Sequence, residues 1–329
     1  MISDASDSCR RKFSLNDSLV VKGVAIIIML FHHCFLAPER YVGQSVNFAP
    51  FSEQQLNAVA LAGKICVALF TFISAYGITY SYKKTSSSYS LTPRQWTASI
   101  VRRTLKIESG FLFIFVFVHM WSLLIMHENG FIRYGSGIKS ILYCAIDACG
   151  LAEFFGTPTL IPTFWYISLA YMIIVFVPLF LFIYRKWGIP TLLLLATCIK
   201  IFFPYTKDAH FTYFPDYAFC ACCGIIAADR NIIGRCSTWL HSIKRLRSTI
   251  ITIVMVLAFV VLMLCRQRTL NTALLPIWDG LIPLLLIIII KNTVGKIAIL
   301  VKCLSVLGKH SRSVENLSAT LQGEMQQLQ

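Results

Sequence analysis

The chain has 329 residues, of which 57% are apolar and only 14% are charged. This composition excludes an ordinary soluble domain, because apolar runs of about 17–22 residues recur and each is long enough to cross a bilayer. The formal net charge of +15 does not indicate nucleic-acid binding, because the basic residues cluster between the apolar runs, as they do in cytoplasmic loops. We therefore predict an all-α, polytopic transmembrane helical bundle of about eight to nine spans, in contact with membrane lipid.

Residues 1–18 are polar and basic, and we expect them to form a cytoplasmic N-terminal lead-in. The first span follows at about 19–36 and carries two adjacent histidines, His32 and His33. Lys22 precedes His33 by 11 residues, which places both on one helix face about 16 Å apart in height. Ionisable groups at such depth normally face a protein interior or a polar cavity, so this helix predicts a polar path; a buried structural histidine is the alternative.

Polar loops separate the further apolar runs. Spans are expected at about 57–80, 107–126, 163–184, 189–204, 214–229, 248–265 and 273–290, with a short apolar patch at 297–307. Residues 138–155 are too short for a span and contain Asp147 and Glu153, so we predict an interfacial or re-entrant segment on the outer side. The transmembrane domain then covers 19–308, and 309–329 form a polar C-terminal tail with the composition of a disordered segment.

The loop charges predict the orientation of the chain. With the N-terminus in the cytoplasm, 22 of the 30 Lys and Arg residues lie in cytoplasmic segments and 6 lie in outer segments. Lys64 and Lys200 lie within spans. This asymmetry favours a cytoplasmic N-terminus.

A basic cluster opens the third span. Arg102 and Lys106 are four residues apart and Arg103 and Lys106 are three apart, so they line one side of a helix end that faces the cytoplasm. Such a cluster can hold the phosphates of an anionic cofactor. The alternative is ordinary anchoring to anionic lipid.

The histidines are the first candidates for chemistry. The unperturbed pKa of histidine lies near neutrality, so His33 can accept or donate a proton, and we assign it the catalytic role with His32 orienting it. Trp165 and Tyr166 lie at an outer boundary, where they either face the substrate or form part of an aromatic belt.

Other groups leave alternatives open. His119, Glu108, Asp216 and Asp279 either line the cavity or pair within the bundle. The closely spaced Cys220, Cys222 and Cys223 read as small packing residues, and we expect no metal. No phosphate-loop or zinc-protease motif is present in the sequence.

Several segments, in order, resemble the membrane-bound acyltransferase 3 family. Lys22 to His33 is similar to the family's first helix, in which a basic residue is followed after ten residues by a histidine. CVALFTFISAYGI resembles its second helix, with Ala75 in place of a glycine, and VRRTLKI resembles its basic motif, with Lys106 where arginine is common. GTPTLIPTFWYISLA resembles the Trp-Tyr-x-Ser start of a later helix. LGKHS, at 307–311, resembles the last conserved stretch, but the closing apolar helix that follows it in the family is apparently lacking.

The resemblance implies a membrane O-acyltransferase that moves an acetyl group from cytoplasmic acetyl-CoA to a hydroxyl of a surface or exported carbohydrate. It implies a multi-pass protein of the cytoplasmic membrane that modifies polysaccharide of the bacterial cell envelope. The essential histidine of the family falls on His33 and its basic partner on Lys22. The residues assigned to the acetyl-CoA donor are Lys22, Arg102, Arg103 and Lys106. The alternatives are a non-enzymatic transporter or exporter of an anionic solute, in which the histidine relays protons, and an inactive truncated family member.

Overall fold

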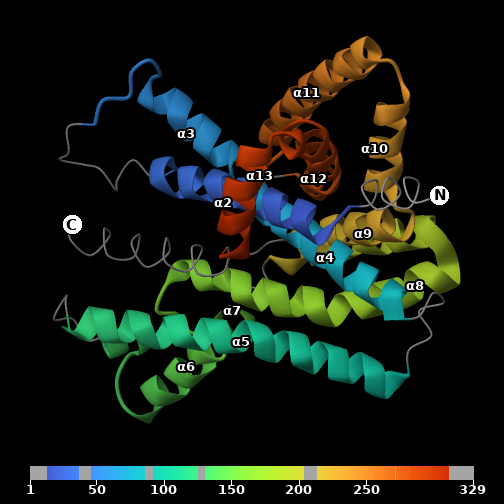
Figure 1. Ribbon diagram of the computed structural model, residues 1–329. Helices are drawn as coiled ribbons and strands as arrows, with labels where there is room; N and C mark the ends of the chain where they lie inside the picture. Colours follow the sequence, from blue (N-terminus) through green and yellow to red (C-terminus); the bar gives the residue numbers. More distant parts are fainter. Residues whose placement is uncertain are drawn as a thin grey trace.

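The computed structural model describes residues 13–36, 46–85, 92–124, 130–203, 213–270 and 272–310. These residues form α-helices and short 3-10 helices, with no strand in the described ranges, which confirms the predicted all-α class. The helices are α2 (Leu15–Phe35), α3 (Glu53–Ala62), α4 (Ile65–Thr85), α5 (Pro93–Leu124), η2 (Gly130–Tyr134), α6 (Ile138–Ala148), α7 (Ala152–Phe155), η3 (Pro162–Phe164), α8 (Trp165–Phe202), α9 (Phe214–Asp229), α10 (Ile232–Ser242), α11 (Arg245–Arg268), α12 (Leu275–Asn292), η4 (Val294–Lys296) and α13 (Ala298–Lys309) (Figure 1).

The long helices have the length and apolarity of membrane spans. In the described ranges 6 helical segments meet this criterion, and the number is 7 if α9 and α10, which meet at a bend of 58°, form one span. The chain is therefore an integral membrane protein. The cytoplasmic N-terminus and the count of spans stay predictions.

Local sequence explains where three of these helices begin. Each starts with a capping box, in which a Ser or Thr hydroxyl accepts from a backbone N–H three residues on and the side chain there accepts in return. The pairs are Ser14 with Asp17, Ser52 with Gln55, and Thr92 with Gln95. As a result α2 begins at Leu15, inside the stretch expected to be a lead-in, and α5 begins well before 107.

The span predicted at 57–80 is interrupted near its beginning. Helix α3 ends at Ala62, a turn follows at Gly63 and Lys64, and α4 starts at Ile65. A Cβ on Gly63 would lie 3.0 Å from the Cβ of His32 and 2.9 Å from the carbonyl oxygen of Ala60. Gly63 therefore lets the end of α2 approach this turn closely.

Helix α8 is broken at Gly188, where φ is 83° and the backbone is not helical. A straight helix of 38 residues would extend about 57 Å, and the chain from Phe203 to Tyr213 can return at most about 36 Å. The ring centroids of Trp165 and Tyr213 nevertheless lie 4.1 Å apart. The two arms of α8 therefore fold towards each other at Gly188, between the spans expected at 163–184 and 189–204.

Helices α4 and α9 form the centre of the bundle (Figure 1). A Cβ on Gly224 of α9 would lie 2.6 Å from the carbonyl oxygen of Phe72, so the two backbones come close. Cys220 and Cys222 are fully buried here, as expected of small packing residues, and the Cys220 thiol donates to the carbonyl of Ala68 at 3.2 Å. Close helix contact through small residues is the usual mode of packing within a membrane.

Helix α13 crosses α2, so the last described helix covers the first (Figure 1). A Cβ on Gly23 would lie 2.2 Å from the carbonyl oxygen of Leu304, and one on Gly308 would lie 1.9 Å from that of Leu19. The crossing thus requires glycine on both helices. The apolar patch expected at 297–307 is this helix.

Helix α11 contacts little besides α12 and exposes its apolar side chains, as a lipid-facing helix does. Its one buried residue is Arg266, whose Nε donates to Asp279 Oδ1 at 2.5 Å. This ion pair joins the end of α11 to α12. Asp279 therefore pairs within the bundle, which resolves one of the alternatives left open by the sequence.

A second hydrophobic cluster joins α5 to η2, α6 and the start of α8. The carboxylate of Asp147 is fully buried there and accepts from the Tyr134 hydroxyl at 2.8 Å, the Thr159 hydroxyl at 2.9 Å and the Leu160 N–H at 2.6 Å. Burial raises the pKa of the Asp147 carboxyl, although the three hydrogen bonds act in the opposite direction. Burial and the neighbouring carboxylate raise the pKa of Tyr134 as well.

Helix α6 buries two polar side chains and exposes several apolar ones. Ser140 and Asp147 are buried, whereas Ile138, Ile141 and Leu142 are 85%, 63% and 57% exposed. A short helix with this arrangement fits the predicted interfacial or re-entrant segment. Its location on the outer side stays a prediction.

Candidate functional site

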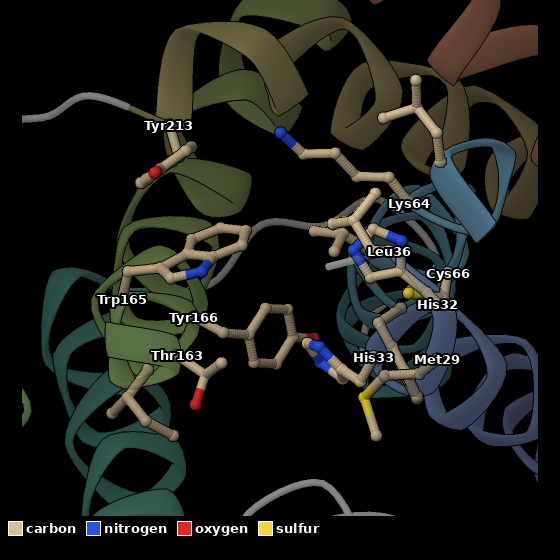
Figure 2. A pocket seen from close by; sticks show the side chains of 14 residues that line it. Met29, His32, His33, Leu36, Lys64, Cys66, Thr163, Trp165, Tyr166 and Tyr213 are labelled. Atoms are coloured by element: carbon tan, nitrogen blue, oxygen red, sulfur yellow. The ribbon is translucent and has the colours of Figure 1, made fainter. Parts of the chain in front are cut away.

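A cavity of about 270 Å³ lies between the end of α2, the turn from α3 to α4, the start of α8 and Tyr213 (Figure 2). Its walls are mostly apolar and aromatic, with a few polar groups, as in small-molecule sites generally. The polar and aromatic lining residues are His32, His33, Lys64, Phe70, Thr163, Trp165, Tyr166 and Tyr213. The structure thus brings together four of the residues selected from the sequence: the two histidines, Trp165 and Tyr166.

His32 is the more buried of the two histidines, with 9% of its surface exposed. Its Nδ1 lies 2.6 Å from the carbonyl oxygen of Ala60. Because a carbonyl only accepts, Nδ1 carries the proton in this contact and Nε2 carries the lone pair in the neutral ring. The contact crosses from α2 to α3 and fixes the orientation of the ring.

His33 is partly exposed to the cavity, and its ring centroid lies 5.2 Å from that of His32. Figure 2 shows the Tyr166 phenol pointing across the cavity towards the His33 imidazole. A partly exposed imidazole in a cavity can reach a ligand hydroxyl, which a buried one held on a carbonyl does less easily. The assignment of the catalytic role to His33 stays a prediction that this geometry accommodates.

Aromatic rings form the opposite wall. The centroids of Trp165 and Tyr213 lie 4.1 Å apart with 32° between the planes, and those of Trp165 and Tyr166 lie 6.1 Å apart at 84°. Trp165 and Tyr166 open α8 directly after the 3-10 turn η3, whereas Tyr213 directly precedes α9. Flat apolar faces with polar tips suit a ligand that is apolar on one side and polar at its edges.

The predicted basic cluster lies outside this cavity. Arg103 is partly buried and donates from Nη2 to the Ser81 hydroxyl, and its guanidinium lies 5.9 Å from the centroid of the Tyr82 ring. Arg102 and Lys106 are exposed on the same helix. Along α4, Ser81 and the cavity residue Cys66 are separated by about 22 Å of helix rise.

Lys22 is partly buried in the N-terminal half of α2, and the unbroken helix separates it from His33 by about 16 Å. This half of α2 packs against the C-terminal half of α4, because Phe13, just before α2, meets Tyr76 with centroids 5.1 Å apart. Lys22 therefore lies towards the end of the bundle that holds Arg103. The four residues assigned to the donor share one end, and the cavity lies towards the other.

Lys64 and Tyr213 are cavity residues that the sequence did not single out for the site. Lys64 appeared there only as a basic residue inside a span. Figure 2 shows its side chain extending towards Tyr213, with Nζ 5.9 Å from the centroid of that ring. The available signal was Lys64 itself, because an ionisable residue inside an apolar run normally faces the protein interior or a polar cavity.

The other ionisable candidates do not line the cavity. Glu108 accepts from the Tyr171 hydroxyl, and Asp216 pairs with Lys200. His119 donates from Nδ1 to the Phe115 carbonyl oxygen at 3.1 Å, and its ring stacks over Tyr134. Over the described part of the chain, no three His, Cys, Asp or Glu side chains gather as a metal site would require.

Comparison with known proteins identifies one family. A family model described as an acyltransferase domain matches residues 18–314, which is most of the chain. No curated protein and no solved structure matches the chain significantly.

Proposed function

The chain belongs to the acyltransferase 3 family of membrane proteins, and from that premise we propose that it moves an acetyl group from cytoplasmic acetyl-CoA to a hydroxyl of a cell-surface or exported carbohydrate. The family establishes a membrane acyltransferase. The proposal adds the acetyl donor, the carbohydrate acceptor, the side of the membrane from which the donor enters and the cytoplasmic membrane as the location.

One observation carries the proposal. The two histidines and an aromatic wall share a cavity, and Arg103 is bound to Ser81, which lies about 22 Å of helix rise along α4 from the cavity residue Cys66. Acetyl-CoA is an elongated molecule with phosphates at one end and a thioester at the other. A bundle with basic groups at one end and a base beside an aromatic cavity at the other suits such a donor and a ring-shaped acceptor.

In the proposed reaction His33 takes the proton of the acceptor hydroxyl while the hydroxyl oxygen forms a bond to the thioester carbonyl carbon. The carbon–sulfur bond then breaks, and the CoA thiolate takes that proton back from His33 and leaves as the free thiol. His32, held on the Ala60 carbonyl, keeps the neighbouring ring in place. In the alternative mechanism the acyl group is first transferred to His33 and then to the acceptor hydroxyl. Lys22, Arg102, Arg103 and Lys106 bind the phosphates of CoA and offset their charge.

The first test is acetyl transfer by the purified protein in detergent, followed through release of the free CoA thiol. His33→Ala should lower the transfer rate by at least about a hundredfold, the smallest contribution expected of a general base. His241→Ala is the matched control, because His241 is exposed on α10 and lies outside the cavity. Full activity of His33→Ala would remove His33 from the mechanism, and an equal loss in His241→Ala would show a general effect on the protein.

A further inference from the structure

Lys64 places an ammonium group in the cavity, and among the residues that the structure describes no carboxylate lies within ion-pair distance of it. Its Nζ lies 5.9 Å from the centroid of the Tyr213 ring, and its charge acts on the Asp279 carboxylate at longer range. The side chain is partly buried in a largely apolar cavity. Removing a charge from water without a partner is unfavourable, so a ligand that brings a negative charge is favoured at this point.

The neighbouring acids are engaged elsewhere. Asp216 pairs with Lys200, and Asp279 pairs with Arg266 in a contact that is almost fully buried on both sides. The protein thus pairs Lys200 and Arg266 with its own carboxylates. Lys64, the cation that lines the cavity, has no such direct pair among the described residues, so the carboxylate of a ligand can bind it.

The anion belongs to the acceptor rather than to the donor. Lys64 shares the cavity with His32 and His33, where the acceptor hydroxyl must lie if His33 is the base. The residues suited to the phosphates of the donor lie towards the other end of α4, as Arg103 shows by its contact with Ser81. A single ammonium also suits a monoanion, whereas a phosphate dianion is typically met by several donors or by the arginine fork.

We propose that Lys64 selects acceptors that carry a carboxylate, so that the substrate is an acidic sugar whose ring packs on Trp165 and Tyr213 and whose carboxylate binds the Lys64 ammonium. This inference rests on the proposed function, because it assumes that the cavity holds the acceptor. It makes Lys64 a specificity-determining residue rather than a catalytic one.

The test compares the affinity of the purified protein for matched sugar pairs, titrated by ligand-observed NMR without any acyl donor. The probes are methyl glucuronide against methyl glucoside, and methyl galacturonide against methyl galactoside, since each pair differs only in the carboxylate. The acidic member of at least one pair should bind about tenfold more tightly or better, as expected of a hydrogen bond to a charged group. Lys64→Gln should abolish the preference, and Lys64→Arg should retain most of it.

Lys139→Gln is the control, because Lys139 is exposed on α6 and does not line the cavity. It should leave the preference unchanged. The inference is overturned if no acidic sugar is preferred, or if the preference survives in Lys64→Gln.

Kinetics separate this inference from the proposed function. If acetyl transfer occurs, Lys64→Gln should raise KM for the acidic sugar and leave KM for acetyl-CoA unchanged; a rise for acetyl-CoA alone would overturn the inference by moving Lys64 to the donor site. If acidic sugars bind through Lys64 but no acetyl group is transferred, the inference stands and the proposed function fails.

Discussion

His32 and His33 are neighbours in the sequence but occupy different surroundings. The first is buried and held by its Nδ1 on the Ala60 carbonyl, and the second is partly exposed to the cavity. Adjacent residues on a helix point about 100° apart, so one faces the packed turn at Gly63 while the other can face a ligand. Variants of the two residues can therefore test separately whether His32 positions its neighbour and whether His33 takes part in the reaction.

His32→Asn should retain most of the transfer activity, because the asparagine Nδ2–H can replace the imidazole Nδ1–H on the Ala60 carbonyl. His32→Ala should lower the rate by about tenfold, which corresponds to about 1.4 kcal/mol, the size of one buried hydrogen bond. The rate of CoA thiol release measures both variants. If His32→Asn were as inactive as His33→Ala, His32 would have a chemical role.

The buried carboxyl of Asp147 should make the stability of the hydrophobic cluster around α6 depend on pH. Its pKa is raised from 3.8, so the folded protein binds this proton more tightly than the unfolded chain does. The resulting stability is fully present below about pH 3.8 and is lost as the pH rises through the raised pKa. Asp147→Asn, which cannot titrate, should remove this contribution.

The measurement is the thermal unfolding midpoint of wild type and Asp147→Asn in detergent at about pH 5 and about pH 8. The wild-type protein should gain more stability on going to the lower pH than the variant does. The comparison uses the change of the midpoint with pH rather than the midpoint itself. Asparagine has one acceptor oxygen where aspartate has two, so Asp147→Asn also weakens the hydrogen bonds from Tyr134, Thr159 and Leu160 at every pH. Equal changes in the two proteins would contradict the raised pKa.

At the scale of the helix, glycine decides how α2 and α13 meet. Gly23→Ala and Gly308→Ala each place a Cβ within 2.2 Å or less of a carbonyl oxygen in the other helix, so the helices must separate. Each should lower the free energy of unfolding by about 1–3 kcal/mol, as overpacking does. Unfolding midpoints in detergent measure the effect.

Gly77→Ala and Gly110→Ala are the matched controls, because a Cβ at either position would meet nothing within 4 Å. Both glycines lie inside helices, where alanine is favoured by up to about 1 kcal/mol, so these variants should be neutral or stabilised. If all four variants were affected alike, the close crossing of α2 and α13 would be wrong.

Sequence periodicity predicted helices better than it predicted their interruptions. The apolar runs predicted the long helices because each run is a local property of the chain. The turn at Gly63 and Lys64 was not predicted, since an isolated glycine in an apolar run is usually tolerated in a helix, and here only the approach of α2 explains it. Helix α10 was read as part of a loop between two spans, because basic and polar residues interrupt its apolar ones.

The site was predictable only in part, because some of its residues are marked by the local sequence and others are brought in by distant segments. His32 and His33 are conspicuous in an apolar helix, and Trp165 and Tyr166 were selected from their place at a span boundary and from the family resemblance. Lys64 and Tyr213 reach the cavity only through the folding back of α8 at Gly188 and the turn after α3. Such contacts join segments far apart in the sequence, and no local pattern encodes them.

For the molecule as a whole, the basic cluster lies towards one end of the bundle and the cavity towards the other. We expect these two ends to face opposite sides of the membrane. Cys303 on α13 lies beside the N-terminal half of α2, whereas Cys149 directly follows α6, and both are exposed. In variants whose single remaining cysteine is Cys149 or Cys303, a membrane-impermeant maleimide should label Cys149 from outside and Cys303 from the cytoplasmic side of sealed vesicles. Labelling of both from one side would contradict the predicted topology.

The crossing of α2 by α13 also affects how the protein is made. Gly23 and Gly308 lie 285 positions apart, so the first helix enters the membrane long before its covering helix has left the ribosome. A chain without residues 298–309 has no helix to cover Gly23. The contact between α2 and α13 therefore forms only after the helices from α3 to α12 have been synthesised.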